Sequence, residues 1–311
     1  MIKRAPAQWF WLAPLTMLVG SGVNAAMPEA TEPSPTPPAG SLSLPFEFVS
    51  GRVLAPIRVN GSDPMSLMLD TGYSIDMLRG EVADKLGLKR AGQITVVGIA
   101  GEEKADLFEG ATYDLPGATY SPRRVAALPP GDQRRWRKRD GILGAGFFRR
   151  FVVEIDPLKK KVFLHEPDTF RYSGGGEVIA FKFNGSTPVV DGAIIVPDRD
   201  PILGRFEIDT GCDGGLCLGS DFVQANNLLE ATGGTRSGQR SGVGGDTSTK
   251  IGRVPQFRVG GLVVQKPLAN FFLEGSPVDA GHAGHIGMDV FRRFKVILDY
   301  SRQRLILEPI D

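Results

Sequence analysis

The 311-residue sequence lacks the residues that several kinds of chemistry need. It has only three histidines and no Gly-x-Ser-x-Gly motif, so a serine triad has little support. The glycine-rich stretch 233–245 has no following lysine and Ser or Thr at phosphate-loop spacing, which argues against nucleotide binding. The sequence also lacks a large net charge, because 36 Lys and Arg residues balance 35 Asp and Glu residues. Nucleic acid and anionic membranes are therefore not expected partners.

The sequence also lacks a run of the roughly 20 apolar residues that a membrane-spanning helix needs. The nearest stretch, 9–19, follows Lys3 and Arg4 and passes into small residues that end at Ala25 and Ala26. This order is typical of a signal peptide over residues 1–25, with a membrane anchor as the alternative. It predicts an exported protein, periplasmic or secreted, with no stable membrane span after cleavage. Residues 26–43, rich in Pro, Ser, Thr and Glu, predict a linker.

Cysteine is scarce, and the two cysteines lie close together in the sequence, at Cys212 and Cys217. In an extended strand this spacing puts their Cα atoms beyond disulfide reach. Only a fold-back at 213–215 would bring them together. Because an exported protein meets oxidising conditions, pairing stays open.

Glycine and proline are abundant, with 40 and 23 residues, which favours short strands joined by turns over long helices. One triplet occurs twice, as Asp70-Thr71-Gly72 and Asp209-Thr210-Gly211. Each copy places an aspartate at the end of an apolar strand, where a charge is unusual. The two aspartates are 139 positions apart (209 − 70), which suggests one acid in each half of a duplicated unit.

The surroundings of the triplet repeat as well. Each copy is followed by a short helical pattern, a hairpin with a glycine-containing tip, and a closing segment. The closing segments match almost residue for residue, and their glycines, Gly144 and Gly287, are 143 positions apart (287 − 144). Their Phe-Arg-Arg-Phe stretches predict core phenylalanines and exposed arginines. A period of about 140 residues indicates a duplicated domain, with lobes at 44–168 and 177–311.

These motifs resemble those of aspartic peptidases. The Asp-Thr-Gly triplets are similar to the family's catalytic motif. The segments Ile142-Leu143-Gly144 and His285-Ile286-Gly287 are similar to its second signature, two apolar residues and a glycine. The resemblance covers about residues 44–310, and each half looks more like a compact retroviral-type unit than a full pepsin lobe. It implies an all-β monomer of two acid-protease-type β-barrel lobes, each with one or two short helices.

The resemblance implies that Asp70 and Asp209 meet between the lobes and hydrolyse peptide bonds. Two close carboxylates cannot both ionise readily, an effect for which aspartic proteases are themselves the standard example. One carboxylate then activates a water, and the other donates a proton to the substrate carbonyl. No metal or other cofactor is required. Because the pair titrates as a unit, the sequence assigns no separate roles to the two acids.

The resemblance also assigns supporting residues. Thr71 and Thr210 would bond to the opposite lobe, and Gly72 and Gly211 would let the backbone turn sharply and approach closely. Flaps at about 98–103 and 242–246 would cover the cleft, with tip glycines at Gly98, Gly101, Gly242, Gly244 and Gly245.

The residues that follow the two glycines depart from the family, whose members usually have Ser or Ala there. The chain has Tyr73 and Cys212. The bulk of Tyr73 favours the alternative function, a non-catalytic peptide-binding or scaffolding protein that keeps the cleft.

Two further motifs have other interpretations. His282 and His285 form a His-x-x-His pair, but only one more histidine exists and no Glu stands at helical spacing, so we expect a loop without metal. The basic run 134–139 is interpreted as a solvated loop in preference to a nucleic-acid patch. Contact of that run with acidic substrates, or with an envelope surface in a structural protein, stays open.

Overall fold

The computed structural model describes residues 2–4, 41–128, 138–273 and 281–310. Most of the predicted signal peptide and linker, and most of the basic run, lie outside these ranges. Within the predicted signal peptide, strand β1 (Ile2–Arg4) pairs with β23 (Leu262–Gln265) at a sheet edge. At the end of the predicted linker, strand β2 (Leu42–Pro45) begins. No helix within the described ranges is long and apolar enough to cross a membrane.

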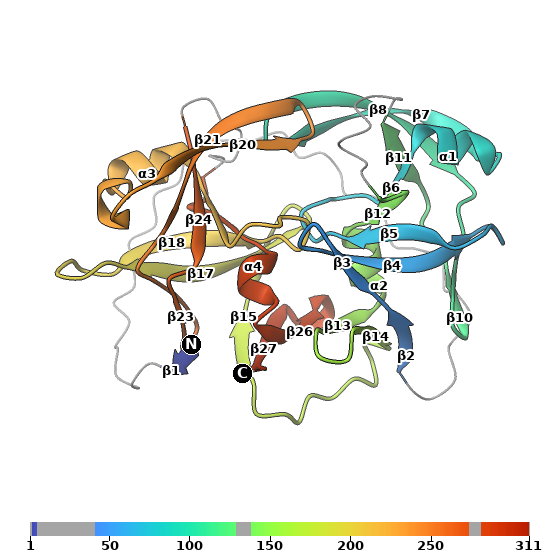
Figure 1. Cartoon of the computed structure of the whole chain (residues 1–311). Coiled ribbons are helices and arrows are strands. Elements are labelled where there is room, and N and C mark those ends of the chain that lie inside the picture. Colours follow the sequence, from blue (N-terminus) through green and yellow to red (C-terminus); the bar gives the residue numbers. More distant parts are fainter. Residues whose placement is uncertain (1, 5–40, 129–137, 274–280, 311) are drawn as a thin grey trace, which may run out of the picture.

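The first lobe is built on a ten-stranded sheet (Figure 1). Its strand order is β10-β9-β4-β5-β12-β6-β11-β8-β7, with β3 beside β4. The strands are β3 (Glu47–Val49), β4 (Arg52–Val59), β5 (Met65–Leu69), β6 (Met77–Arg79), β7 (Lys89–Gly98), β8 (Gly101–Glu109), β9 (Tyr113–Leu115), β10 (Ala118–Tyr120), β11 (Val125–Leu128) and β12 (Gly141–Leu143).

The second lobe repeats this sheet strand for strand. Its order is β23-β22-β17-β18-β25-β19-β24-β21-β20, with β16 beside β17. The equivalence of every position fits the internal duplication expected from the sequence. The strands are β16 (Lys182–Asn184), β17 (Thr187–Ile195), β18 (Ile202–Ile208), β19 (Leu216–Leu218), β20 (Arg236–Gly242), β21 (Gly245–Arg253), β22 (Gln256–Val259), β23, β24 (Leu268–Phe272) and β25 (Gly284–Ile286).

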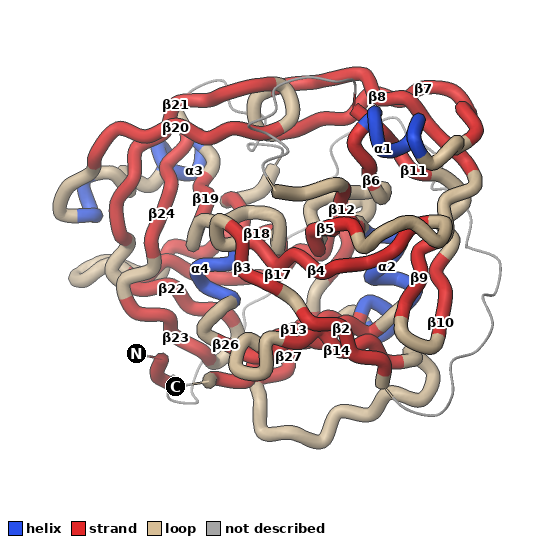
Figure 2. The backbone as a smooth tube through the Cα atoms, turned by 45° about the vertical axis from the view of Figure 1, so that its right-hand side comes forward, coloured by secondary structure: helices blue, strands red, loops and turns tan. Residues whose placement is uncertain are grey.

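A six-stranded sheet joins the lobes, in the order β15-β27-β26-β13-β14-β2. Its central contact pairs β13 of the first lobe with β26 of the second, through buried residues such as Val153 and Leu298. In Figures 1 and 2 this sheet lies at the bottom, opposite the hairpins β7–β8 and β20–β21 at the top. The remaining strands are β13 (Val152–Asp156), β14 (Lys161–His165), β15 (Glu177–Ala180), β26 (Phe294–Asp299) and β27 (Arg304–Pro309).

The helices are few and short, which confirms the predicted fold class. They are α1 (Gly80–Lys85), α2 (Ala145–Arg150), α3 (Ser220–Ala225) and α4 (Met288–Phe291), with 3-10 turns at Glu230–Thr232 and Tyr300–Arg302. The Phe-Arg-Arg-Phe prediction is confirmed for the phenylalanines and for the first arginine of each stretch, whereas Arg150 and Arg293 are half-buried. Phe148 and Phe291 are buried, whereas Arg149 and Arg292 are exposed. The phenylalanines therefore anchor α2 and α4 to the core.

Candidate active site

The two aspartates stand at equivalent strand ends and converge between the lobes. Asp70 follows β5 and Asp209 follows β18, and each donates its backbone N–H to the strand alongside, at Leu143 and Ile286, over 3.0 Å. A Cβ placed on Gly72 would lie 3.1 Å from Asp209 Oδ1 and 3.2 Å from Asp70 Oδ1. Both carboxylates therefore face one point, as the resemblance to aspartic peptidases implied.

Reciprocal hydrogen bonds between Thr71 and Thr210 fix this approach. The Thr71 N–H donates to Thr210 Oγ1 over 3.1 Å, and the Thr210 N–H donates to Thr71 Oγ1 over 3.0 Å. Each hydroxyl also donates to a carbonyl of the opposite lobe, Thr71 to Ile208 over 2.6 Å and Thr210 to Leu69 over 2.9 Å. Both threonines are fully buried, so these bonds hold the strand ends together without competition from water.

The glycines of the triplets are required for close approach. A Cβ on Gly211 would lie 1.9 Å from Asp70 Oδ2, which no side chain can tolerate. Neither Gly72 nor Gly211 has a positive φ. Both lie in turns, as expected, but because neither turn uses a positive φ, the space between the carboxylates is the reason for glycine.

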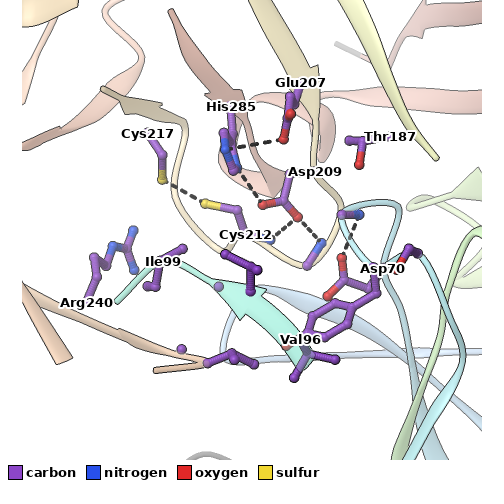
Figure 3. A pocket seen from close by; sticks show the side chains of 18 of the residues that line it. Asp70, Val96, Ile99, Thr187, Glu207, Asp209, Cys212, Cys217, Arg240 and His285 are labelled. Carbon is purple, nitrogen blue, oxygen red and sulfur yellow. Dashed lines mark hydrogen bonds and ion pairs between the residues drawn. The ribbon is translucent and has the colours of Figure 1, made fainter. Parts of the chain in front are cut away.

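His285 gives the two carboxylates different surroundings. Its Nδ1 lies 3.0 Å from Asp209 Oδ2, and its Nε2 lies 3.4 Å from Glu207 Oε2 (Figure 3). His282 Nδ1 approaches the same Glu207, at 3.7 Å from Oε1. The expectation of a loop at His285 is wrong, because His285 lies on β25, where it pairs in register with Glu207 of β18. The sequence signal was the histidine that replaces an aliphatic residue in the second signature.

These surroundings shift the two aspartates in opposite directions. Burial, and next the charge of Asp209, raise the pKa of Asp70 to about 7. Burial also opposes ionisation of Asp209, but the hydrogen bond and charge of His285 outweigh it and lower the pKa of Asp209. Backbone N–H groups of Gly211 and Cys212 add to this effect, at 2.9 and 3.0 Å from Asp209 Oδ1. Near neutral pH, Asp70 therefore holds a proton more readily than Asp209 does.

The two glycine-tipped hairpins meet above the carboxylates. In each of them the closing glycines pair across the hairpin, Gly98 with Gly101 and Gly242 with Gly245. The Ala100 N–H donates to the Val243 carbonyl over 3.2 Å, so the tips bond to each other. A cavity of about 730 Å³ lies beneath them. Of the predicted flap glycines, Gly98 and Gly242 line this cavity, whereas Gly101, Gly244 and Gly245 are not among its lining residues.

Side chains from both lobes complete the cavity lining. Tyr73 lines it and packs against the apolar cluster that contains Val96 on the first flap. Ile99 and Val243 at the flap tips and Arg139, the last residue of the basic run, also line it. Ile99 and Val243 fall within the predicted flaps, whereas the place of Arg139 in the cavity was not predicted, because it depends on contacts between distant segments.

The cysteines lie beside this cavity as free thiols, with their sulfurs 2.9 Å apart (Figure 3). The chain therefore makes the fold-back at 213–215 that the sequence analysis named as the condition for their approach. The Cys217 thiol, and next burial, raise the pKa of the Cys212 thiol.

A second buried acid, Asp76, braces the first lobe and was missed by the sequence analysis. Its Oδ1 accepts the Gly144 N–H over 2.7 Å. Burial raises the pKa of Asp76 to about 7. In the second lobe the Gly287 N–H donates instead to the Gly215 carbonyl over 2.7 Å. The Asp76 side chain in the first lobe thus takes the place of a backbone acceptor in the second.

Two carboxylates from duplicated β lobes, tied by threonines and covered by two flaps, define a site of the aspartic peptidase type. The comparison with protein families agrees, because residues 55–147 match the family model described as aspartyl protease. This match supports an aspartic peptidase family assignment. The matched span contains Asp70, the first flap and β12. The chain matches none of the curated proteins.

Proposed function

We propose that the protein is an exported aspartic endopeptidase that hydrolyses peptide bonds through a water activated by Asp70 and Asp209. The observation that carries this proposal is the convergence of one carboxylate from each lobe beneath two flaps. The family match supports a protease-type function.

The proposed reaction uses the two carboxyl groups as acid and base. The ionised group removes a proton from the water as it attacks the peptide carbonyl carbon, and the protonated group donates to the carbonyl oxygen. The tetrahedral intermediate then collapses, and a proton passes to the leaving nitrogen. Opposite pKa shifts at the two aspartates support this division of labour, because each proton state is favoured at one position.

The paired flaps support a retroviral-type arrangement within a single chain. Each lobe contributes one hairpin, and the tips interlock through the bond from Ala100 to Val243. Because one chain supplies both aspartates and both flaps, we propose a monomer. Export rests on the signal-peptide pattern of residues 1–25.

A non-catalytic peptide-binding protein is the second candidate, favoured by Tyr73, which occupies part of the cavity wall. The experiment is cleavage of a peptide library by the protein, scanned from acid to neutral pH, with Asp70→Asn and Asp209→Asn alongside. Cleavage lost in both variants supports the endopeptidase. Cleavage that persists in either variant contradicts the shared site, and binding without cleavage by the unmodified protein supports the second candidate.

A further inference from the structure

The two lobes differ at one pair of equivalent positions beside the aspartates. In the first lobe Met68 of β5 pairs in register with Ile142 of β12. In the second lobe the same register pairs Glu207 of β18 with His285 of β25. An apolar pair, each member 2% exposed, thus corresponds to an ionisable pair whose side chains are 18% and 17% exposed. Because the apolar pair suffices for packing and partly buried charges are expensive, the ionisable pair calls for a role beyond packing.

The imidazole of His285 lies between two carboxylates. One ring nitrogen faces Asp209 at 3.0 Å and the other faces Glu207 at 3.4 Å. A carboxylate accepts hydrogen bonds but does not donate them, so the bond to Asp209 places an N–H on Nδ1. The second carboxylate, 3.4 Å from Nε2, favours a proton there as well, which gives the cationic form. The equivalent neighbour of Asp70 is Ile142, which has no polar atom in its side chain. Among the described residues His285 therefore gives Asp209 a hydrogen-bonded cationic partner, whereas on Asp70 the charges of Arg139 and Arg52 act without outweighing burial.

The other ionisable groups around His285 come from each adjoining element. The neighbouring strand β19 carries Cys217, which pairs in register with His285, and the loop before β19 carries Cys212. Flap strand β20 carries Arg240, which bonds to Asp213 over 2.5 Å. The Cys217 thiol, and next burial, raise the pKa of the Cys212 thiol and so oppose a charge there, and Arg240 has its own carboxylate. Glu207 and Asp209 are therefore the charges that determine the state of His285.

We propose that His285, held by Glu207, is a positioning residue that fixes Asp209 as the ionised member of the pair and leaves the proton on Asp70. Asp209 is then the base that activates water, and Asp70 is the acid that donates to the carbonyl. This assignment rests on the proposed function and adds to it the order of roles within the pair. The pKa of His285 supports this assignment. Burial opposes the charge on His285, but the hydrogen bond and charge of Asp209, and the charge of Glu207, raise its pKa to about 9.

The test is the pH dependence of kcat/KM in His285→Ile, which gives the second lobe the residue of the first. His285 lowers the pKa of Asp209. Replacing His285 therefore raises the pKa of Asp209 and moves the acid limb of the kcat/KM profile to higher pH. We expect a shift of at least about one unit, and a loss of tenfold or more at pH values on the old acid limb. His285→Asn keeps a hydrogen-bond donor without the charge and should shift the limb less, as should Glu207→Gln.

The matched control is His165→Gln. His165 forms a similar pair, with Nε2 2.9 Å from Glu154 Oε2, but lies in the sheet that joins the lobes. This variant should leave the profile unchanged. An acid limb that does not move in His285→Ile, or a loss that is equal at every pH, overturns the proposal. Thermal unfolding of each variant identifies a misfolded protein, and in that case His285→Asn supplies the profile.

Nuclear magnetic resonance titration separates this proposal from the proposed function, because it needs no turnover. With three histidines in the chain, one imidazole should titrate near pH 9, disappear in His285→Ile and titrate lower in Asp209→Asn. Carboxyl carbon-13 shifts should show Asp209 ionised and Asp70 protonated near pH 5. Equal titration of the two carboxyl groups overturns the proposal. Failure of peptide cleavage with these titrations intact contradicts only the endopeptidase function.

Discussion

The two Asp-Thr-Gly triplets are identical in sequence, but their carboxylates have different partners. Asp70 Oδ1 accepts the N–H of Gly72 over 2.9 Å. Asp209 accepts two backbone N–H groups and lies against the imidazole of His285. Hydrogen bonds to the ionised form favour it, whereas burial without them favours the protonated form. The chemistry at the residue scale is therefore asymmetric although the fold is duplicated.

Asp76 gives a stability prediction at the same scale. Its pKa in the folded protein is about 7, against 3.8 ordinarily. Because folding raises this pKa, the contribution of Asp76 to the free energy of unfolding is fully present below pH 3.8. That contribution is lost as the pH rises through about 7. Asp76→Asn keeps an oxygen for the Gly144 N–H and cannot ionise. We expect a free energy of unfolding at pH 8 above that of the unmodified protein, by at most about 4 kcal/mol, with no gain at pH 4.

Denaturant unfolding at the two pH values measures this effect. Asp84→Asn is the control, because the side chain of Asp84 is 61% exposed, and it should change little at either pH. Equal destabilisation by Asp76→Asn at pH 4 and pH 8 would contradict this prediction, because the effect would then not depend on ionisation of the carboxyl group.

At the scale of elements, the two flap tips meet in a contact that leaves no room for an added Cβ. A Cβ on Gly98 would lie 2.4 Å from the Cβ of Val243 on the opposite flap. Gly98 does not have a positive φ, so alanine fits its backbone and only the contact between the flaps suffers. We therefore expect the position of one flap to depend on that of the other.

Gly98→Ala should hold the flaps apart and weaken binding. We expect KM for a cleaved peptide to rise about tenfold or kcat/KM to fall by a similar factor, as lids commonly affect both, with little change in Tm. Gly175→Ala is the matched control, since a Cβ there meets nothing within 4 Å. Steady-state kinetics of the two variants decide the matter, and unchanged kinetics in Gly98→Ala would remove the role assigned to tip contact.

At the scale of the whole molecule, the pH profile belongs to both lobes together. Asp70 must keep its proton to act as the acid, and its pKa is about 7. We expect kcat/KM to fall about tenfold per pH unit above about 7. On the acid side, activity should persist toward pH 3.8, because the pKa of Asp209 is lowered from that value. A profile with its neutral limb near pH 4 would contradict the raised pKa of Asp70.

Much of the fold was predictable from local pattern. Apolar strands, glycine turns and the repeat identified β5, β18 and both hairpins, because period and turn chemistry are local properties. The convergence of Asp70 and Asp209 was implied by the resemblance to aspartic peptidases, which the duplicated motif carries. The contact of His285 with Asp209 was not predictable in the same way, since it depends on the register of β25 against β18. Asp76 and the bond between flap tips were missed for the same reason.

The account rests on two aspartates that act as one site, and a double-variant cycle measures this directly. The rates of peptide cleavage are compared for Asp70→Asn, Asp209→Asn and the double variant. Groups that act as a unit give losses that do not multiply. We predict that each single variant loses at least about a thousandfold and that the double variant loses about the same. Losses that multiply, or a single variant that keeps most of its activity, would contradict a shared catalytic pair.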